Sequence, residues 1–158
     1  MKTYLDTLNS NKAPAGDGIY FTNGDAFLYN FNIPWTTKCH HEAKYVKKTT
    51  LQEIDNSGML DWVYCDENVH VLDVERNLKL TAGGGTYGGD GFVACWKLEI
   101  SELLWLAFFE DSNPFEKLYL NREHVFAVST HNCTWKFGID NPLDLTIDCE
   151  GYWVNKKI

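Results

Sequence analysis

Three neighbouring segments decide the fold of this chain: Gly-Gly-Gly-Thr-Tyr-Gly-Gly-Asp-Gly (83–91), Phe-Val-Ala-Cys-Trp-Lys (92–97) and Glu-Leu-Leu-Trp-Leu-Ala-Phe-Phe-Glu-Asp-Ser-Asn-Pro-Phe (102–115). The run from Leu103 to Phe109 is the most apolar in the sequence. It is too short to span a bilayer and too rich in aromatic residues to face water, so we expect it in the core. A helix over 101–109 is the alternative, but strand-like segments on both sides favour a strand.

Short segments rich in β-branched and aromatic residues continue on both sides of this run. We predict strands at residues 18–22, 26–31, 49–54, 59–65, 69–74, 78–81, 92–98, 115–120, 124–130, 134–139, 143–149 and 152–154. Turn residues such as Asn23-Gly24-Asp25 separate them at roughly eight- to twelve-residue intervals, which is typical of a sandwich or barrel. The sequence therefore predicts one mainly β domain over residues 1–158, an antiparallel β-sandwich or half-open barrel with one or two short helices near the N-terminus.

Two N-terminal segments are less clearly patterned. Residues 1–16 combine a short amphipathic piece with loop composition, and either one helical turn or a strand suits them. Residues 33–48 contain Pro34 and show neither the helix nor the strand period, so a helix of about two or three turns and a long connection both remain open.

Size and charge limit the function classes. At 158 residues and 18.1 kDa, with 15% aromatic residues, the chain suits one globular domain. Its net charge is −8, and its only arginines are Arg76 and Arg122. The basic stripe of a nucleic-acid-binding protein is therefore missing. Acidic charge either keeps the protein soluble or steers it onto a basic partner.

Cysteine usage bears on the compartment. The five cysteines are spread along the sequence, and the polar start Met-Lys-Thr-Tyr-Leu-Asp does not resemble a secretory signal. No stretch reaches transmembrane length. We therefore expect reduced thiols, several of them buried as small apolar groups, in a cytoplasmic protein that does not enter a membrane.

The glycine-rich segment lacks the features of a phosphate-binding loop. Such loops place backbone N–H groups at a helix N-terminus beside a Gly-Lys-Ser/Thr motif. Residues 83–91 lack that motif and precede a strand-like segment. We interpret them as a structural hairpin connection around Tyr87, or as a contact loop whose backbone approaches a partner closely.

Histidines and cysteines form no recognisable catalytic or metal motif. Cys39-His40-His41 lacks the paired spacing of zinc ligands, so we expect exposed loop histidines, no metal and no cofactor. Nothing in the local sequence activates a thiol. A nucleophilic pair would have to be assembled in space from His124 or His131 with Cys95 or Cys133.

Carboxylates gather in the predicted loops, where a solvated acidic rim is the default interpretation. Glu110 and Asp111 stand out because they end the most apolar strand and precede the turn Ser112-Asn113-Pro114. A tryptophan at a surface can dominate binding energy, although any single tryptophan is more often in the core. The residues that we predict to contact a partner are Tyr87, Asp90, Glu110, Asp111 and Trp135.

Several phrases of the sequence resemble small bacterial immunity proteins of contact-dependent inhibition and polymorphic toxin systems. They are Gly-Thr-Tyr-Gly-Gly-Asp-Gly-Phe-Val-Ala (85–94), Leu-Trp-Leu-Ala-Phe-Phe-Glu-Asp-Ser-Asn-Pro-Phe (104–115), Val-Phe-Ala-Val-Ser-Thr (125–130) and Trp-Lys-Phe (135–137). The resemblance implies a cytosolic, non-enzymatic protein that binds one cognate toxin domain, often a basic nuclease, and blocks its active site. It carries over no individual binding residue.

The sequence thus favours a toxin-neutralising immunity protein, monomeric or weakly oligomeric, and leaves two alternatives. One is a barrel-like module with a pocket for a small apolar or sugar ligand. The other is a hydrolase with a carboxylate or Cys-His centre, which would need titratable groups converging on a cleft.

Overall fold

The structure, a computed structural model, describes residues 4–30, 38–42 and 44–150, and consists mainly of antiparallel β-strands. The first elements are α1 (Tyr4–Leu8), β1 (Lys12–Pro14), β2 (Gly18–Phe21), β3 (Asp25–Asn30), β4 (Lys38–Glu42), β5 (Lys44–Thr50), α2 (Leu51–Asn56) and β6 (Trp62–Asp73). They are followed by β7 (Leu78–Gly85), β8 (Gly91–Lys97), β9 (Glu102–Phe109), β10 (Phe115–Leu120), β11 (His124–Ser129), β12 (Cys133–Gly138) and β13 (Leu145–Glu150).

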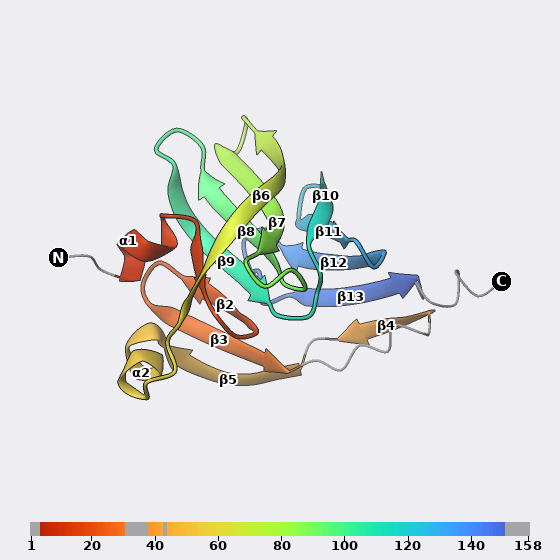
Figure 1. The fold of residues 1–158 in the computed structure, drawn as a ribbon. Helices are drawn as coiled ribbons and strands as arrows, with labels where there is room; N and C mark the ends of the chain where they lie inside the picture. Colours follow the sequence, from red (N-terminus) through yellow and green to blue (C-terminus); the bar gives the residue numbers. More distant parts are fainter. Residues whose placement is uncertain (1–3, 31–37, 43, 151–158) are drawn as a thin grey trace.

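These strands form two sheets, shown in Figure 1. One sheet has the order β1-β6-β7-β8-β9-β2-β3-β5 and the other the order β10-β11-β12-β13-β4. Each paired strand runs antiparallel to its neighbour. The prediction of a mainly β, sandwich-like fold with short helices is confirmed.

The larger sheet carries apolar side chains on both faces of its central strands. Alternate residues of β8 and β9, among them Val93, Cys95, Trp105, Ala107 and Phe109, join the smaller sheet's residues in a first core. The residues between them join a second core with α1, β1, α2 and the start of β6 (Phe92, Ala94, Trp96, Leu106 and Phe108). Because neither face of β9 meets water, its sequence is a continuous apolar run and not an alternating one.

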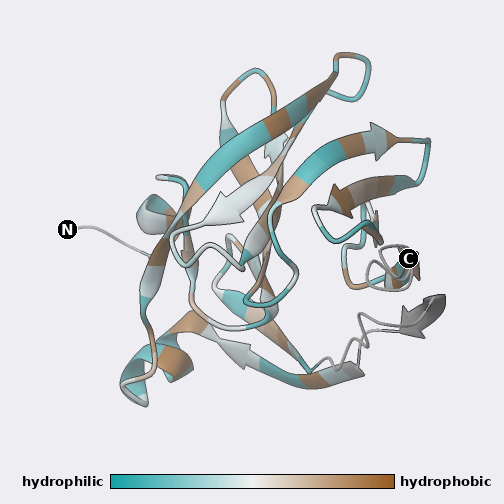
Figure 2. Cartoon of the chain, turned by 45° about the vertical axis from the view of Figure 1, so that its right-hand side comes forward, coloured by the Kyte–Doolittle hydropathy of each residue, from teal (hydrophilic) through white to brown (hydrophobic). Residues whose placement is uncertain are grey.

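Strands at the margins of the sandwich keep the alternating pattern. On β6, the half-buried Val69 and Val71 alternate with the exposed His70 and Leu72. Figure 2 shows hydrophobic and hydrophilic bands following one another along this long strand. β6 also corrects the prediction of two strands, at 59–65 and 69–74, separated by a turn. The polar residues between the two predicted strands lie within one long strand, and its register with β7 shifts between Glu67 and Val69. A bulge accommodates an extra residue without ending the strand.

The N-terminal third contains both a confirmed and a wrong prediction. The hairpin of β2 and β3 turns at Asn23 and Gly24, where Gly24 has φ +95° and Asn23 Oδ1 accepts from the N–H of Asp25 at 2.9 Å. The strand predicted over 49–54 is wrong from Leu51 onward, because α2 begins there. Thr50 caps this helix by accepting a hydrogen bond from the N–H of Glu53 at 3.1 Å.

The segment 33–48 is not helical in its described part. β4 pairs with β13 in the smaller sheet, and β5 pairs with β3 in the larger one. β4 and β5 therefore belong to different sheets, and the short helix considered for this segment is wrong over residues 38–42 and 44–48. Residues 33–37, 43 and the strand predicted at 152–154 lie outside the described residues.

Two of the cysteines are paired. Cys133 and Cys149 face each other on β12 and β13 and form a disulfide, with their Cα atoms 4.1 Å apart. The prediction of reduced thiols is therefore wrong for this pair. Cys65 and Cys95 are free and buried, and burial raises the pKa of each thiol to about 12. A thiol that keeps its proton is a poor nucleophile, so Cys95 does not suit the Cys-His pair considered above.

Arg76 links the two sheets at one margin. Its guanidinium bonds the Asp73 carboxylate and also donates to the carbonyl oxygens of Arg122 at 2.5 Å and Asn121 at 3.1 Å. The side chain thus joins the turn between β6 and β7 to the turn between β10 and β11. An open groove of about 820 Å³ runs between these elements and is partly lined by the exposed apolar residues Leu72, Val74 and Tyr119.

Candidate functional site

Antiparallel pairing brings two of the sequence-predicted segments to one end of the larger sheet. Gly91, the first residue of β8, is opposite Gly84 of β7 and Phe109 of β9. The loop between β7 and β8 and the turn after β9 therefore lie at the same end. We call the surface formed there by Asp17, Tyr87, Glu110 and Asp111 the acidic end.

The loop that carries Tyr87 is held from inside by Asp90. This side chain is fully buried, and its carboxylate accepts hydrogen bonds from the N–H groups of Gly85 at 2.9 Å and Tyr87 at 3.4 Å. A Cβ on Gly85 would lie 2.2 Å from an Asp90 oxygen, so glycine is required there. Tyr87 is left at the tip of an ordered loop, with 64% of its surface exposed.

The turn after β9 is tied to this loop. The N–H of Asn113 donates to the carbonyl oxygen of Gly89 at 2.8 Å. Asn113 has φ +62°, a left-handed conformation that asparagine tolerates better than most residues. Ser112 is buried and its hydroxyl donates to the carbonyl oxygen of Asn113 at 2.9 Å. These bonds turn Glu110 and Asp111 outward, and both are exposed.

Asp17 joins this surface from the connection between β1 and β2. One of its carboxylate oxygens accepts a hydrogen bond from the N–H of Glu110 at 2.8 Å. Burial raises the pKa of Asp17 to about 6, the hydrogen bond from Glu110 opposes this shift, and the negative charges of Glu110 and Asp111 add to it. Asp17 therefore exchanges its proton close to neutral pH, whereas an ordinary aspartate is ionised well below it.

The neighbouring Tyr20 shows the same electrostatic environment from inside. Its hydroxyl donates to the carbonyl oxygen of Gly16 at 2.9 Å. Burial raises the pKa of Tyr20, and the charges of Asp17 and Glu110 raise it further. Negative potential at this end thus reaches from the surface into the second core.

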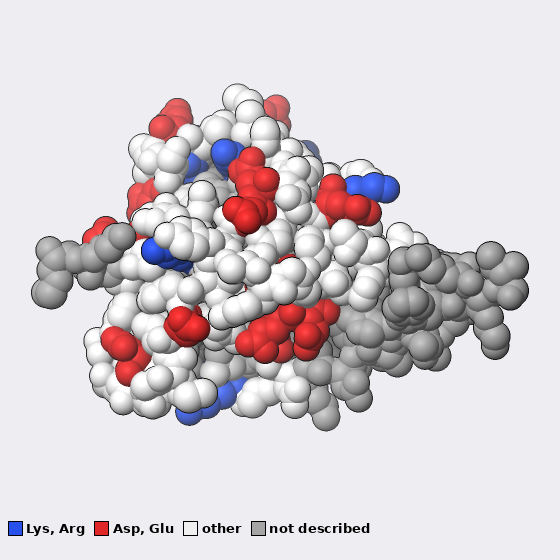
Figure 3. Space-filling model, in the orientation of Figure 1, with Lys and Arg blue, Asp and Glu red and all other residues white. Residues whose placement is uncertain are grey.

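Acidic side chains also gather visibly on this part of the molecule. Figure 3 shows a patch of Asp and Glu below the centre of the view, in the region where β9 ends in Figure 1. The Lys and Arg side chains on this face are scattered. The charge distribution on this side therefore favours a basic partner.

Two of the five predicted contact residues are not at the surface. Asp90 is the buried loop anchor described above, and Trp135 is 1% exposed. The Trp135 ring packs in the first core against Phe109 and Phe115, with ring centroids 4.5 and 5.8 Å apart. Assigning Asp90 and Trp135 to a contact surface is therefore wrong. A contact role for Tyr87, Glu110 and Asp111 remains a prediction, and Asp17 is the residue that sequence reasoning missed.

Metal ligation has little support in the described part of the chain. Within residues 4–30, 38–42 and 44–150, no group of three or more His, Cys, Asp or Glu residues is arranged to hold a metal ion. The side chains of Cys39, His40 and His41 lie outside the described residues. His131, on the turn between β11 and β12, lies 2.7 Å from the Asn113 amide through its Nδ1 atom, and burial lowers its pKa.

Comparisons with known proteins add no assignment. No protein-family model matches the chain, and no curated protein matches it. Neither of the helices that the structure describes is long and apolar enough to cross a membrane. The functional argument therefore rests on the geometry of the acidic end.

Proposed function

We propose that this chain is a protein-binding domain that uses its acidic end to engage a basic protein surface. The observation that carries the proposal is the bond from Asn113 to Gly89, which holds exposed Tyr87 beside Glu110 and Asp111 in one ordered surface. Tyrosine is one of the residues enriched at binding hot spots. The carboxylates would speed the encounter, and Tyr87 would supply buried contact area.

The finer proposal is that the partner is a bacterial toxin domain, and that the protein neutralises it by occupying its active site. The resemblance to immunity proteins supports this, and so does the net charge of −8, which suits a basic nuclease. The proposal includes no catalytic step and no cofactor. A cytoplasmic location belongs to the same proposal, although the disulfide weighs against it because thiols are usually kept reduced there.

A capture experiment tests the proposal. Tagged protein is used as bait in a lysate of its source cells, and chains that survive a high-salt wash are identified. We expect one basic chain at near-stoichiometric amount, which stops growth when expressed alone in a laboratory bacterium and not when co-expressed with this protein.

Charge reversal then locates the interface. The double variant Glu110→Lys, Asp111→Lys should lower association with the captured chain by at least tenfold, because two attractive interactions become repulsive. The matched control, Glu75→Lys with Glu99→Lys, makes the same charge change at exposed sites at the other end of the sheet. Equal binding by the two doubles would refute the acidic end as the interface. A captured chain that does not affect growth would refute the toxin assignment alone.

A further inference from the structure

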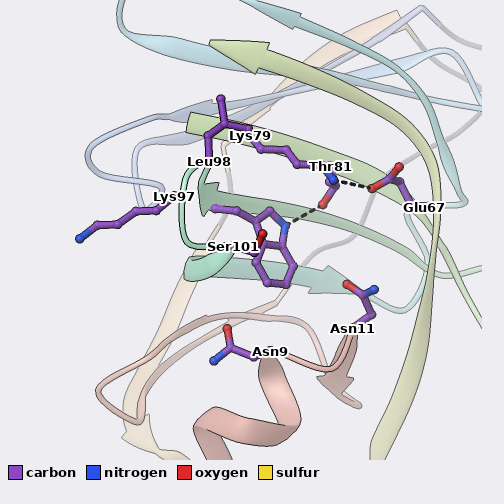
Figure 4. A pocket seen from close by; sticks show the side chains of 9 residues that line it. Asn9, Asn11, Glu67, Lys79, Thr81, Lys97, Leu98 and Ser101 are labelled. Carbon is purple, nitrogen blue, oxygen red and sulfur yellow. Dashed lines mark hydrogen bonds and ion pairs between the residues drawn. The ribbon is translucent and has the colours of Figure 1, made fainter. Parts of the chain in front are cut away.

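A cavity of about 220 Å³ lies at the opposite end of β8 from the acidic end. One wall is the connection between α1 and β1, with Asn9 and Asn11, and the other is formed by β6, β7, β8 and the turn after β8. Figure 4 shows Asn9 and Asn11 on one side of the cavity and Lys79, Thr81 and Glu67 on the other. We call this cavity the Trp96 pocket, because Trp96 forms its floor together with Thr81.

The floor of the Trp96 pocket is fixed in position. Trp96 and Thr81 are 8% and 4% exposed, and the indole Nε1–H donates to Thr81 Oγ1 at 3.0 Å. That bond satisfies the polar atom of the indole and holds the plane of the ring. The indole therefore offers carbon surface to a ligand, which is the usual contribution of an aromatic side chain to a small-molecule site.

Two carboxamides face the pocket with hydrogen-bonding capacity left over. Asn9 Oδ1 accepts from the N–H of Leu103 at 3.0 Å, which orients the amide, and its NH₂ group makes no hydrogen bond to the residues that the structure describes. Asn11 has φ +59°, and its carbonyl oxygen accepts from the N–H of Cys65 at 2.8 Å. Its side-chain amide likewise has no partner within the described chain. A carboxamide supplies both donors and acceptors, as a hydroxyl group requires.

The charges that line the pocket cancel. Lys79 Nζ lies 3.8 Å from a Glu67 carboxylate oxygen, and the other oxygen of Glu67 is 3.2 Å from His70 Nδ1. Lys97 also lines the rim, but Figure 4 shows its side chain extending away from the cavity. One member of the Glu67–Lys79 pair would attract a charged ligand and the other would repel it, whereas hydroxyl groups can donate to Glu67 and accept from Lys79.

From this lining we propose that the Trp96 pocket binds a neutral polyhydroxylated molecule the size of a single monosaccharide. The volume is below the roughly 300–1,000 Å³ of sites for drug-sized ligands, so one ring is accommodated and a longer oligosaccharide is not. The ring's C–H groups lie on the indole, and its hydroxyls bond to Asn9, Asn11 and the Glu67–Lys79 pair. This inference does not depend on the protein-binding proposal, because the two surfaces share no residue.

Isothermal titration and ligand-observed NMR with the full chain test this site. The probes are glucose, galactose, mannose, N-acetylglucosamine, ribose and myo-inositol, each compared with the charged molecules glycine, glutamate and inorganic phosphate. We expect saturable binding of at least one neutral probe in preference to every charged one. Absence of saturable binding by all neutral probes would overturn the site, and tighter binding of a charged probe would overturn the ligand class.

Asn11→Gly is the variant that locates the ligand. Glycine adopts positive φ without strain, so the variant removes the carboxamide while preserving the backbone. Loss of one or two neutral hydrogen bonds should weaken binding by about 3- to 10-fold. Asn56→Gly at the exposed end of α2 is the matched control and should bind as the parent does. If Asn11→Gly is folded by circular dichroism and binds with unchanged affinity, the ligand is not in this pocket.

Discussion

Replacing Asp17 with asparagine should change how the stability of the protein depends on pH. The folded-state pKa of Asp17, about 6, lies above its ordinary value of 3.8. Between these values the folded state holds a proton that the unfolded state has lost. The free energy of unfolding therefore falls as pH rises through this range, and the contribution of Asp17 is fully lost above the folded-state pKa.

The size of the effect follows from the same interval. At 1.36 kcal/mol per pH unit, the range from 3.8 to about 6 corresponds to about 3 kcal/mol, and partial exposure of Asp17 reduces this to about 2 kcal/mol. Asparagine keeps an Oδ1 atom that can accept the 2.8 Å hydrogen bond from Glu110, but it carries no charge to bury. We therefore compare the free energy of unfolding of Asp17→Asn with that of the parent at each pH. The variant-minus-parent difference should be about 2 kcal/mol larger, in favour of the variant, at pH 8 than at pH 4.

Urea unfolding at fixed ionic strength from pH 4 to pH 8 measures this difference. Glu75→Gln removes an exposed carboxylate from the turn between β6 and β7 and is the control for the loss of one negative charge. A pH-independent difference between Asp17→Asn and the parent would show that burial does not raise the pKa of Asp17 in the folded protein. The electrostatic description of the acidic end would then be wrong.

Two further predictions concern stability. Replacing both Cys133 and Cys149 with serine should lower the free energy of unfolding, measured in urea, by about 3 kcal/mol, because the disulfide closes a loop with a sequence separation of 16. Dithiothreitol should lower the urea midpoint of the parent and leave that of the variant unchanged. A parent midpoint that does not move would argue that the pair is not oxidised. Arg76→Met should lower the free energy of unfolding by about 1–2 kcal/mol, because it removes the hydrogen bonds between the β6–β7 turn and the β10–β11 turn while keeping much of the aliphatic stem. Thermal unfolding measures this loss. Arg122→Met is the control, because it keeps the backbone carbonyl that accepts the hydrogen bond.

The strand formed by the apolar run at 103–109 was the part of the fold that the sequence predicted best. A stretch with apolar residues at successive positions suits a strand that is buried on both faces, and β9 is such a strand. The helix at 51–56 was also readable in principle, because Thr50 and Glu53 have the spacing of a capping box. The strand prediction over 49–54 did not use that local signal.

The contact residues were less predictable because exposure is decided by distant parts of the chain. Nothing near Trp135 in the sequence indicates that Phe109 and Phe115 cover its ring. Asp90 resembles any polar loop residue until its hydrogen bonds to Gly85 and Tyr87 are seen. Asp17 is 93 residues from Glu110, so only the folded chain shows that they are neighbours.

The burial of β8 and β9 on both faces also determines how the protein unfolds. These strands contribute side chains to both apolar cores, so neither core can open without removing a wall from the other. Segments that share such a wall unfold together, since partial opening exposes apolar surface without releasing a separable unit. The two sheets should therefore unfold as one cooperative unit. A destabilising substitution at the acidic end of β9 should then destabilise both cores.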